Sequence, residues 1–361
     1  MISTYKMAVG FDSKLSGCSV LVTGADGFVG SHLTEYLLER GAEVCVFIRA
    51  VSSGELRNTG HLLRKVKVFR GNLADPLSVR LAVRDFKKAS GNKIIFHLGA
   101  QAHVGESWSR PYETFESNTL GTLNLLQSIV DEDLDLYRMD FAGTSEEFGN
   151  LNHEMKELYE FRKDGVVVFN EKSPLSPESP YAVSKVAGDF LCKNYHKAYG
   201  LPVIVTRMFN NYGPRQNPRY VTGTIITQAL SRGTVELGAL EPTRDFTYVT
   251  DGVRGHVYAT LGGKPGDTYS FGYGEDISIG DWARLILGIG EREGYWKNRR
   301  VVQRKGRLRP GKTDLMSLGV DYTKLMEKTG WKPLVSREEG LKKTIKYYAE
   351  NRDAWWGRID W

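Results

Sequence analysis

Short runs of β-branched and apolar residues alternate with segments of helical periodicity through the first half of the chain. Between residues 18 and 207 the extended runs are SVLVTG, EVCVFI, KVKVF, KIIFHLG, LYRMDFAG and PVIVTR. Residues 29–40 and 118–130 place leucine and valine at spacings of three and four, which is typical of half-buried helices. Strands that alternate with helices build parallel sheets with crossover helices. The sequence therefore predicts an α/β fold with a doubly wound parallel sheet of the Rossmann type.

The second half of the chain has shorter elements, which glycine and proline interrupt. Helical patterns cover residues 222–231, 252–261 and 337–348, and the run DFTYV is extended. A chain of 361 residues exceeds the length at which one hydrophobic core stops growing, so two lobes are expected. We predict a dinucleotide-binding domain at 16–207 with returning segments from the second half, a smaller C-terminal α/β substrate lobe at 208–350, and an aromatic tail at 351–361.

Composition argues against several classes of function. The formal charge is +6, but basic and acidic residues are interleaved, so nucleic acid is not an expected partner. The densest basic cluster, at residues 299–309, fits either an anion site or a solvated loop. Neither a signal peptide nor a stretch of roughly 20 apolar residues is recognisable, so we expect a cytoplasmic protein without a membrane partner. Three scattered cysteines predict neither disulfides nor a metal site.

A glycine-rich turn follows the first predicted strand. Gly24, Gly27 and Gly30 recur at every third position between the strand and the next helix. Glycine lets the backbone bend there and approach a pyrophosphate, whose charge the helix N-terminus meets, so the turn predicts dinucleotide binding. The second strand ends at Arg49, where an NAD-preferring site would carry an acid, and Ser52 and Ser53 follow. An arginine there can pair with a 2′-phosphate, which favours NADP over NAD. The alternative is that Arg49 is a surface residue at the end of a strand.

Tyr181 and Lys185 in the run SPYAVSK lie four residues apart, and therefore on one face of a helix. At that spacing the ammonium group can lower the pKa of the phenol and reach a cofactor ribose. A tyrosinate so placed takes the proton of a hydroxyl group while hydride leaves the same carbon. This pair predicts a dehydrogenase-type catalytic site.

Taken together, these motifs resemble the extended short-chain dehydrogenases that act on nucleotide sugars. The resemblance spans residues 23–333. Its elements appear in the order TGADGFVG, GNLAD, HLGAQAHVGES, Asn118, TSEEFG, SPYAVSK, RMFNNYGPRQ, RDFTYVTD, RPGKTDL and GWKP.

The resemblance implies roles for individual residues. For the cofactor it implies Gly24, Asp26, Gly27, Phe28, Val29, Gly30, Arg49, Asn72, Leu73, Leu98, Ala100, Tyr181 and Lys185. For a nucleotide-diphosphate sugar it implies His103, Asn210, Arg215, Arg244 and Arg309. It also implies a homodimer or homotetramer in which the helices near residues 118–130 and 181–199 pair.

Thr144, Ser145 and Glu146 direct the choice of reaction. UDP-galactose-type epimerases usually have small or apolar residues at the position of Glu146, whereas dehydratases and uronate decarboxylases keep the acid. Resemblance to the 4,6-dehydratases implies that Tyr181 deprotonates O4 of the sugar while hydride leaves C4. Glu146 then removes the C5 proton, water leaves from C6, and hydride returns to C6.

Several details look like GDP-mannose 4,6-dehydratase, namely GAQAHV, TSE, Arg49 with its serines, and RPGKTDL. The segments RMFNNYGPRQ and RDFTYVTD and the stretch 149–171 look more like dTDP-glucose dehydratases and UDP-sugar epimerases. GDP-mannose is therefore the favoured substrate. A 4-epimerase, a UDP-glucuronate decarboxylase and, from another class, a non-catalytic NADPH-binding Rossmann protein are the alternatives.

Overall fold

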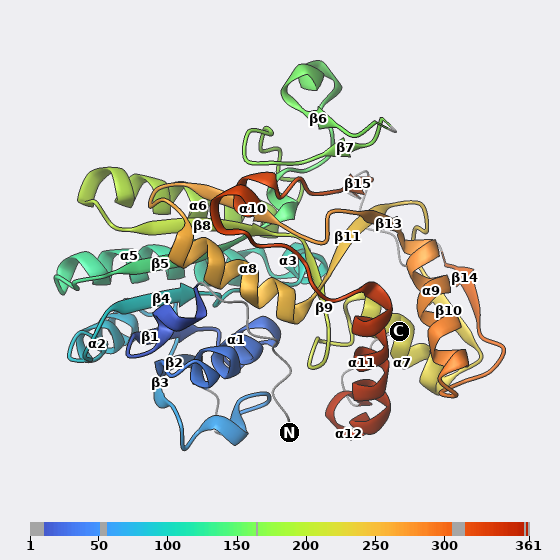
Figure 1. Cartoon of the computed structure of the whole chain (residues 1–361), viewed down its shortest axis with the longest axis horizontal. Coiled ribbons are helices and arrows are strands. Elements are labelled where there is room, and N and C mark those ends of the chain that lie inside the picture. Colours follow the sequence, from blue (N-terminus) through green and yellow to red (C-terminus); the bar gives the residue numbers. More distant parts are fainter. Residues whose placement is uncertain (1–10, 51–55, 164, 305–314, 357–358, 360–361) are drawn as a thin grey trace.

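The computed structural model describes residues 11–50, 56–163, 165–304, 315–356 and 359. At its centre is a parallel sheet of seven strands (Figure 1). In spatial order they are β3 (Lys67–Gly71), β2 (Glu43–Arg49), β1 (Ser19–Thr23), β4 (Lys93–His97), β5 (Arg138–Thr144), β8 (Val203–Met208) and β12 (Thr268–Phe271). The strand order reverses between β1 and β4, where doubly wound sheets bind their ligands.

Helices cover both faces of this sheet, which buries its strands on two sides (Figure 1). One apolar core lies under α1 (Phe28–Glu39), α8 (Val249–Gly262) and α10 (Thr323–Thr329). The other lies under α2 (Pro76–Phe86), α5 (Gly121–Asp131) and α6 (Pro180–Tyr199). The predicted fold class, a doubly wound Rossmann-type sheet, is confirmed.

A smaller lobe comes mainly from the second half of the chain and has its own apolar core. Its helices are α7 (Val221–Ser231), α9 (Ile279–Arg292), α11 (Arg337–Glu350) and α12 (Arg352–Trp355). Its strands are β9 (Asn210–Tyr212), β10 (Thr234–Leu237), β11 (Thr243–Tyr248), β13 (Asp276–Ser278), β14 (Arg300–Gln303) and β15 (Ser317–Leu318). In the tail, Trp355 is buried, and its indole N–H donates to the Tyr348 carbonyl at 2.8 Å, so this residue packs onto the lobe.

The stretch between β5 and α6 protrudes from the molecule, at the top of Figure 1. It contains η5 (His153–Leu158), β6 (Glu160–Phe161) and β7 (Val167–Val168). At its base, Tyr159, Val167 and Phe169 pack with Phe148 and Phe209 in a separate apolar cluster. This stretch is therefore a surface insertion with its own packed base.

The remaining short elements lie between or beside these helices and strands. They are η1 (Asp12–Leu15), η2 (Gly60–Leu62), α3 (Val104–Ser109), α4 (Pro111–Phe115), η3 (Glu116–Leu120) and η4 (Ser145–Glu147). η3 is a π-helical turn, so the single helix predicted at 118–130 is in fact η3 followed by α5. No helix within the described ranges is long and apolar enough to cross a bilayer.

Candidate active site

The parallel register aligns the carboxyl ends of the central strands. Thr23 at the end of β1 pairs in register with Phe47 on β2 and with His97 on β4, and His97 pairs with Phe141 on β5. The segments that follow these strands therefore lie along one edge of the sheet. Predicted site residues from five segments meet there, namely Gly24, Arg49, Asn72, Leu73, Leu98, Ala100, Thr144, Ser145 and Glu146.

The glycine turn has the close packing that a dinucleotide fold requires. Gly24 has a left-handed backbone (φ 70°), and a Cβ atom there would lie 2.8 Å from the Cα atom of Gly99. A Cβ atom at Gly30 would lie 2.2 Å from the Gly24 carbonyl oxygen. Among the described residues, no side chain caps the start of α1 at Phe28. Its free N–H groups and the glycine backbone therefore fit a pyrophosphate.

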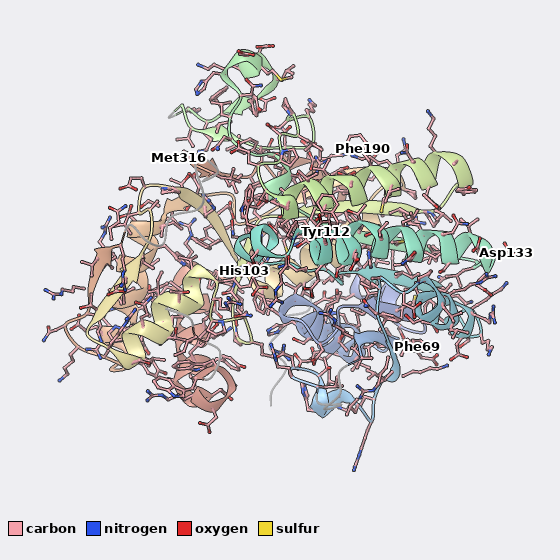
Figure 2. The ribbon with its side chains drawn as sticks, turned by 180° about the vertical axis from the view of Figure 1, so that it is seen from behind. Phe69, His103, Tyr112, Asp133, Phe190 and Met316 are labelled. Atoms are coloured by element: carbon pink, nitrogen blue, oxygen red, sulfur yellow. The ribbon has the colours of Figure 1, made fainter. Side chains whose placement is uncertain are left out.

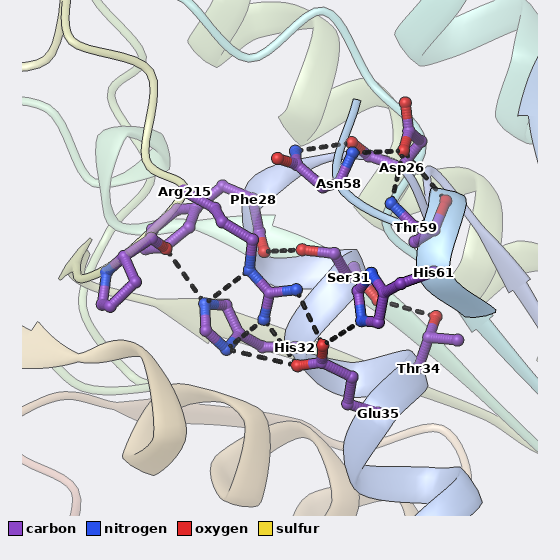
Figure 3. A network of polar contacts seen from close by, with 12 residues as sticks. Asp26, Phe28, Ser31, His32, Thr34, Glu35, Asn58, Thr59, His61 and Arg215 are labelled. Atoms are coloured by element: carbon purple, nitrogen blue, oxygen red, sulfur yellow. Dashed lines mark hydrogen bonds and ion pairs between the residues drawn. The ribbon is translucent and has the colours of Figure 1, made fainter. Parts of the chain in front are cut away.

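Asp26, within the same turn, holds a neighbouring segment (Figure 3). Its carboxylate accepts hydrogen bonds from the backbone N–H groups of Arg57, Asn58 and Thr59, at 2.8 to 2.9 Å, and from the Thr59 hydroxyl group at 2.9 Å. The Asn58 side chain donates back to the Asp26 carbonyl at 2.8 Å. In the structure Asp26 thus fixes residues 57–59 against the glycine turn, and a direct contact with the cofactor stays a prediction.

Two other predicted cofactor residues also have protein partners. The guanidinium group of Arg49 is mostly exposed and lies 3.3 Å from the Glu113 carboxylate. The side-chain oxygen of Asn72 accepts from the Ala74 N–H at 3.1 Å, in the turn that precedes α2. Ser52 and Ser53 lie outside the described residues.

The predicted catalytic pair projects from the first turns of α6, where the Ser179 side chain caps the helix. Tyr181 is hydrogen-bonded to the Thr144 side chain, and both are buried. Burial raises the pKa of Tyr181, and the nearby phenol of Tyr220 raises it further, while the bond to Thr144 lowers it. The predicted lowering of the Tyr181 pKa by Lys185 is therefore not seen in the protein alone, where burial dominates and the pKa is raised.

Lys185 is also buried, and its ammonium nitrogen lies 4.4 Å from the centre of the Phe141 ring. Burial lowers the pKa of Lys185 to about 8, and the negative charge of Glu147 opposes that shift. A lysine in this state remains largely protonated near neutral pH but is sensitive to nearby charge.

Ser145 and Glu146 lie in η4, directly after β5, and both are buried. The Thr144 side chain accepts from the Glu146 N–H at 3.3 Å, and Glu147 accepts from the Thr144 N–H at 2.9 Å. These two bonds form a capping box, which fixes the turn. The structure therefore brings Thr144, Glu146 and Tyr181 together, and their catalytic roles stay predictions.

His97 lies beneath the site, between Thr23 and Thr122. The Thr122 hydroxyl group donates to the Asn118 carbonyl, so it accepts from His97 Nε2 at 3.1 Å. His97 Nδ1 then accepts from the Thr23 hydroxyl group at 2.7 Å, which describes a neutral ring. Burial and the Lys185 ammonium group lower the pKa of His97 to about 3.

Because His97 is buried and neutral, we predict that the folded protein loses stability in acid. Its folded pKa of about 3 lies below the ordinary value of 6.5, so stability is complete above 6.5 and is lost as pH falls toward 3. Relative to His97→Asn, the wild-type free energy of unfolding is expected to fall by about 1.4 kcal/mol per pH unit in that window. Urea unfolding of both proteins between about pH 7 and about pH 4.5 measures the difference. A difference that does not change with pH would contradict a neutral buried His97.

On the substrate side, His103 caps α3 by accepting from the Glu106 N–H. Its ring lies 5.4 Å from the ring of Tyr220, whose hydroxyl group donates to the Ala102 carbonyl at 3.0 Å. Arg219 forms an ion pair with Glu106. These contacts join the segment before α7 to the segment after β4, across the strand ends.

Asn210 lies on β9, and its side-chain oxygen is buried without a hydrogen-bond partner among the described residues. A buried unpaired polar atom next to a site is expected to bind a ligand or water. Arg244 on β11 is buried, and its guanidinium group donates to the Thr243 and Leu315 carbonyls, each at 2.8 Å. Arg309 lies outside the described residues. Substrate contacts of these residues stay predictions.

Arg215 has a different place from the one expected of a substrate ligand. Its guanidinium group lies 2.6 Å from the Glu35 carboxylate and 2.7 Å from His32 Nδ1, both on α1 (Figure 3). Glu35 also accepts from His61 at 2.7 Å. The backbone of Arg215 is left-handed (φ 71°), a conformation that persists in a non-glycine residue when its contacts fix it. Arg215 thus ties the segment before α7 to α1, the helix that follows the glycine turn.

We expect Arg215→Ala to lower the free energy of unfolding by about 1–3 kcal/mol, because it leaves the half-buried Glu35 without its cation. It should also raise KM for the sugar, since residues 213–220 lose their attachment to α1. Thermal unfolding and steady-state kinetics measure the two effects. Arg284→Ala, which breaks an exposed pair with Asp281, is the control and should change little. Equal effects of both variants would contradict the role of Arg215.

Two residues of the site, Tyr220 and Glu147, were not predicted from the sequence. Tyr220 follows no recognisable motif, and its place beside Tyr181 arises from the fold of the second lobe. Glu147 is adjacent to Glu146 in TSEEFG, and the doubled acid was the one available signal. Within the described residues, no group of three His, Cys, Asp or Glu side chains is placed to hold a metal ion.

Comparisons with known proteins agree with this geometry. The family model described as GDP-mannose 4,6 dehydratase matches residues 21–344. The dTDP-glucose 4,6-dehydratase of Streptomyces niveus is 31% identical over 349 residues, which are 93% of this chain and 94% of that protein. DesIV, the dTDP-glucose 4,6-dehydratase of Streptomyces venezuelae solved with NAD, has a TM-score of 0.80 and 28% identity, over 94% of this chain and 100% of that one. UDP-glucose 4-epimerase of Thermus thermophilus has a TM-score of 0.75 and 31% identity, over 92% and 99%.

The seven-stranded parallel sheet, the glycine turn and the Tyr181 and Lys185 pair define an extended short-chain dehydrogenase. Within that class, the chain belongs to the nucleotide-sugar 4,6-dehydratase family of NAD(P)-dependent hydro-lyases.

Proposed function

We propose that this protein removes water across C5 and C6 of a nucleotide-diphosphate hexose and yields the 4-keto-6-deoxy sugar. The observation that carries the proposal is the contact between Tyr181 and the Thr144 side chain, in the same capped turn as the carboxylic acid of Glu146. Oxidation at C4 and proton removal at C5 take place on adjacent carbons. The groups that perform these two steps must therefore lie within the span of one sugar ring.

The roles of the protein groups follow from their positions. Bound NAD(P) supplies the hydride acceptor for C4 and the donor for C6. Tyr181 takes the O4 proton, with Thr144 as its hydrogen-bond partner, and Lys185 provides positive charge behind the phenol. The resulting 4-keto group acidifies the C5 proton, which Glu146 removes and passes to the departing C6 hydroxyl group, so that this group leaves as water. C5 regains a proton when hydride reaches C6, and the proton that Tyr181 took from O4 balances it. The buried setting of all four residues excludes water from these transfers.

The test is to incubate the protein separately with GDP-mannose, dTDP-glucose, UDP-glucose and UDP-glucuronate and to follow the products by mass spectrometry. Loss of one water from a substrate supports the proposal and names its nucleotide. GDP-mannose is the sugar nucleotide that the motifs favour, whereas the named dehydratase relatives act on dTDP-glucose. An isomer of unchanged mass or a lost carboxylate would instead indicate an epimerase or a decarboxylase.

For the cofactor we propose NADP, selected by Arg49 at the end of β2. Its guanidinium group is mostly exposed, so a 2′-phosphate could replace Glu113 as its partner. Arg49→Ala should weaken NADP binding by about tenfold, the value of one charge-assisted contact, and leave NAD binding unchanged. Calorimetric titration of both cofactors measures this. Tighter binding of NAD than of NADP by the wild type would refute the proposal, and the related DesIV structure holds NAD.

We further propose a homodimer through α4, η3 and α6. The large apolar side chains exposed along these neighbouring elements are Tyr112, Phe115, Leu120, Val183 and Phe190. Tyr112 and Phe190 are labelled in Figure 2. An apolar strip of this kind marks an association surface. Phe190→Asp should give monomers in light scattering after gel filtration, whereas Leu334→Asp, at an exposed leucine outside the strip, should not. A monomeric wild type would refute the proposal.

A further inference from the structure

A line of four buried or half-buried charges runs behind the catalytic pair. Glu147 in η4 accepts from the Arg207 side chain (Nε to Oε2, 2.9 Å), and Arg207 lies on β8 of the seven-stranded sheet. The other end of the guanidinium group donates to Asp189 on α6 at 2.5 Å. Asp189 is also 2.7 Å from the ammonium group of Lys193. The side chains of Glu147 and Asp189 are fully buried, and that of Arg207 is 3% exposed.

These four charged side chains connect η4, the turn with Glu146, to α6, the helix with Tyr181 and Lys185. Glu147 accepts from the backbone N–H of Thr144 at 2.9 Å, so its carboxylate fixes the turn that holds Thr144 and Glu146. Asp189 lies on α6, two turns after Tyr181 and one turn after Lys185. The Arg207 guanidinium group therefore holds the turn and the helix at a set separation through one rigid, planar group.

The neighbouring backbone is shaped around the Glu147 carboxylate. A Cβ atom at Gly143 would lie 2.7 Å from Glu147 Oε1 and 2.8 Å from the Thr206 carbonyl oxygen. Glycine at 143 is thus required for the carboxylate to reach the Thr144 N–H. Burying such a network costs more than filling the space with apolar side chains, so stability alone does not explain it.

The Glu147 charge also acts on Lys185. The groups whose charge raises the pKa of Lys185 are Glu147, Cys192, Asp140 and Asp189, with Glu147 having the largest influence, and the Lys185 charge in turn lowers the pKa of the neutral His97. Burial raises the pKa of Glu147 and the Arg207 guanidinium group opposes that rise, so the carboxyl is charged at alkaline pH. Without the Glu147 charge, burial would lower the pKa of Lys185 further.

We propose that Glu147 is a positioning residue of the dehydration site, which fixes the Thr144 to Glu146 turn against α6 and supplies the fixed negative charge that faces Lys185. The inference rests on the proposed function, because it assigns Glu147 to the support of the same groups. It predicts that Lys185 loses its proton at a lower pH when Glu147 is neutral.

The test compares Glu147→Gln with Asp189→Asn. Glutamine keeps a side-chain oxygen that accepts from the Thr144 N–H, and it removes the negative charge of Glu147. The Asp189→Asn substitution removes the other carboxylate of Arg207, which influences Lys185 less. In Glu147→Gln the alkaline limb of the pH profile of kcat should move down by about one pH unit, the lower end of the effect of a nearby charge. Asp189→Asn should move it clearly less. An unmoved limb in Glu147→Gln, or an equal shift in both variants, would overturn the proposal.

Two further measurements keep the result interpretable. Cofactor binding by calorimetry over the same pH range needs no sugar, so a protein inactive toward every sugar nucleotide still reports the titration of Lys185. If Glu147→Gln fails to fold, the variant that combines Glu147→Val, Arg207→Met and Asp189→Val replaces the network by apolar side chains, which proteins often accept. A wild-type alkaline limb in that variant would also overturn the proposal.

Discussion

Tyr181→Phe is expected to lower kcat by about 10² to 10⁴-fold, the usual value of a general acid or base. The phenol is the group in contact with Thr144, and phenylalanine keeps its ring packing while it removes the acid and base. Rates of product formation, measured with whichever sugar nucleotide the protein dehydrates, test this. Cofactor binding should change little, because Lys185 and the glycine turn remain.

Tyr220→Phe is the matched control for this variant. Tyr220 is the neighbouring phenol, but its hydroxyl group already donates to the Ala102 carbonyl. Its loss should therefore affect kcat far less than the loss of the Tyr181 hydroxyl group. If Tyr181→Phe retains activity within about tenfold of the wild type, less than a catalytic base supplies, Tyr181 is not the group that takes the O4 proton.

The sequence predicted those parts of the site that short patterns encode. The glycine turn follows from the steric needs of Gly24 and Gly30, and both are met by close backbone contacts in the structure. Tyr181 and Lys185 share a helix face because four residues span about one turn. Their meeting with Thr144 follows from the parallel order of β5 and its neighbours, which the alternating pattern also predicted.

The parts that the sequence did not predict depend on partners far along the chain. Arg215 matched a family motif, yet its contacts are with Glu35 and His32, about 180 positions away. In the sequence Glu147 is only the residue after Glu146, and its partner Arg207 on β8 lies 60 positions away. The π-helical turn η3 has the same apolar spacing as an α-helix, so periodicity could not separate the two.

Glu146→Gln is expected to stop dehydration while it leaves the first oxidation intact. Glutamine has nearly the shape of glutamate, so the capped turn should persist, but it cannot accept the C5 proton. Turnover should fall by about 10² to 10⁴-fold. Because Tyr181 and Lys185 are unchanged, the reduced cofactor should accumulate to a detectable level after sugar is added, as absorbance near the reduced nicotinamide band.

Glu146→Asp provides the conservative control, since it keeps a carboxylate at a shorter reach and should recover part of the turnover. Exchange of the C5 hydrogen with deuterated solvent measures the proton transfer itself, and it should disappear in Glu146→Gln. If this variant still dehydrates the sugar, another base serves C5. If it loses cofactor reduction as well, Glu146 acts on the sugar before oxidation, and the division of labour between Tyr181 and Glu146 is wrong.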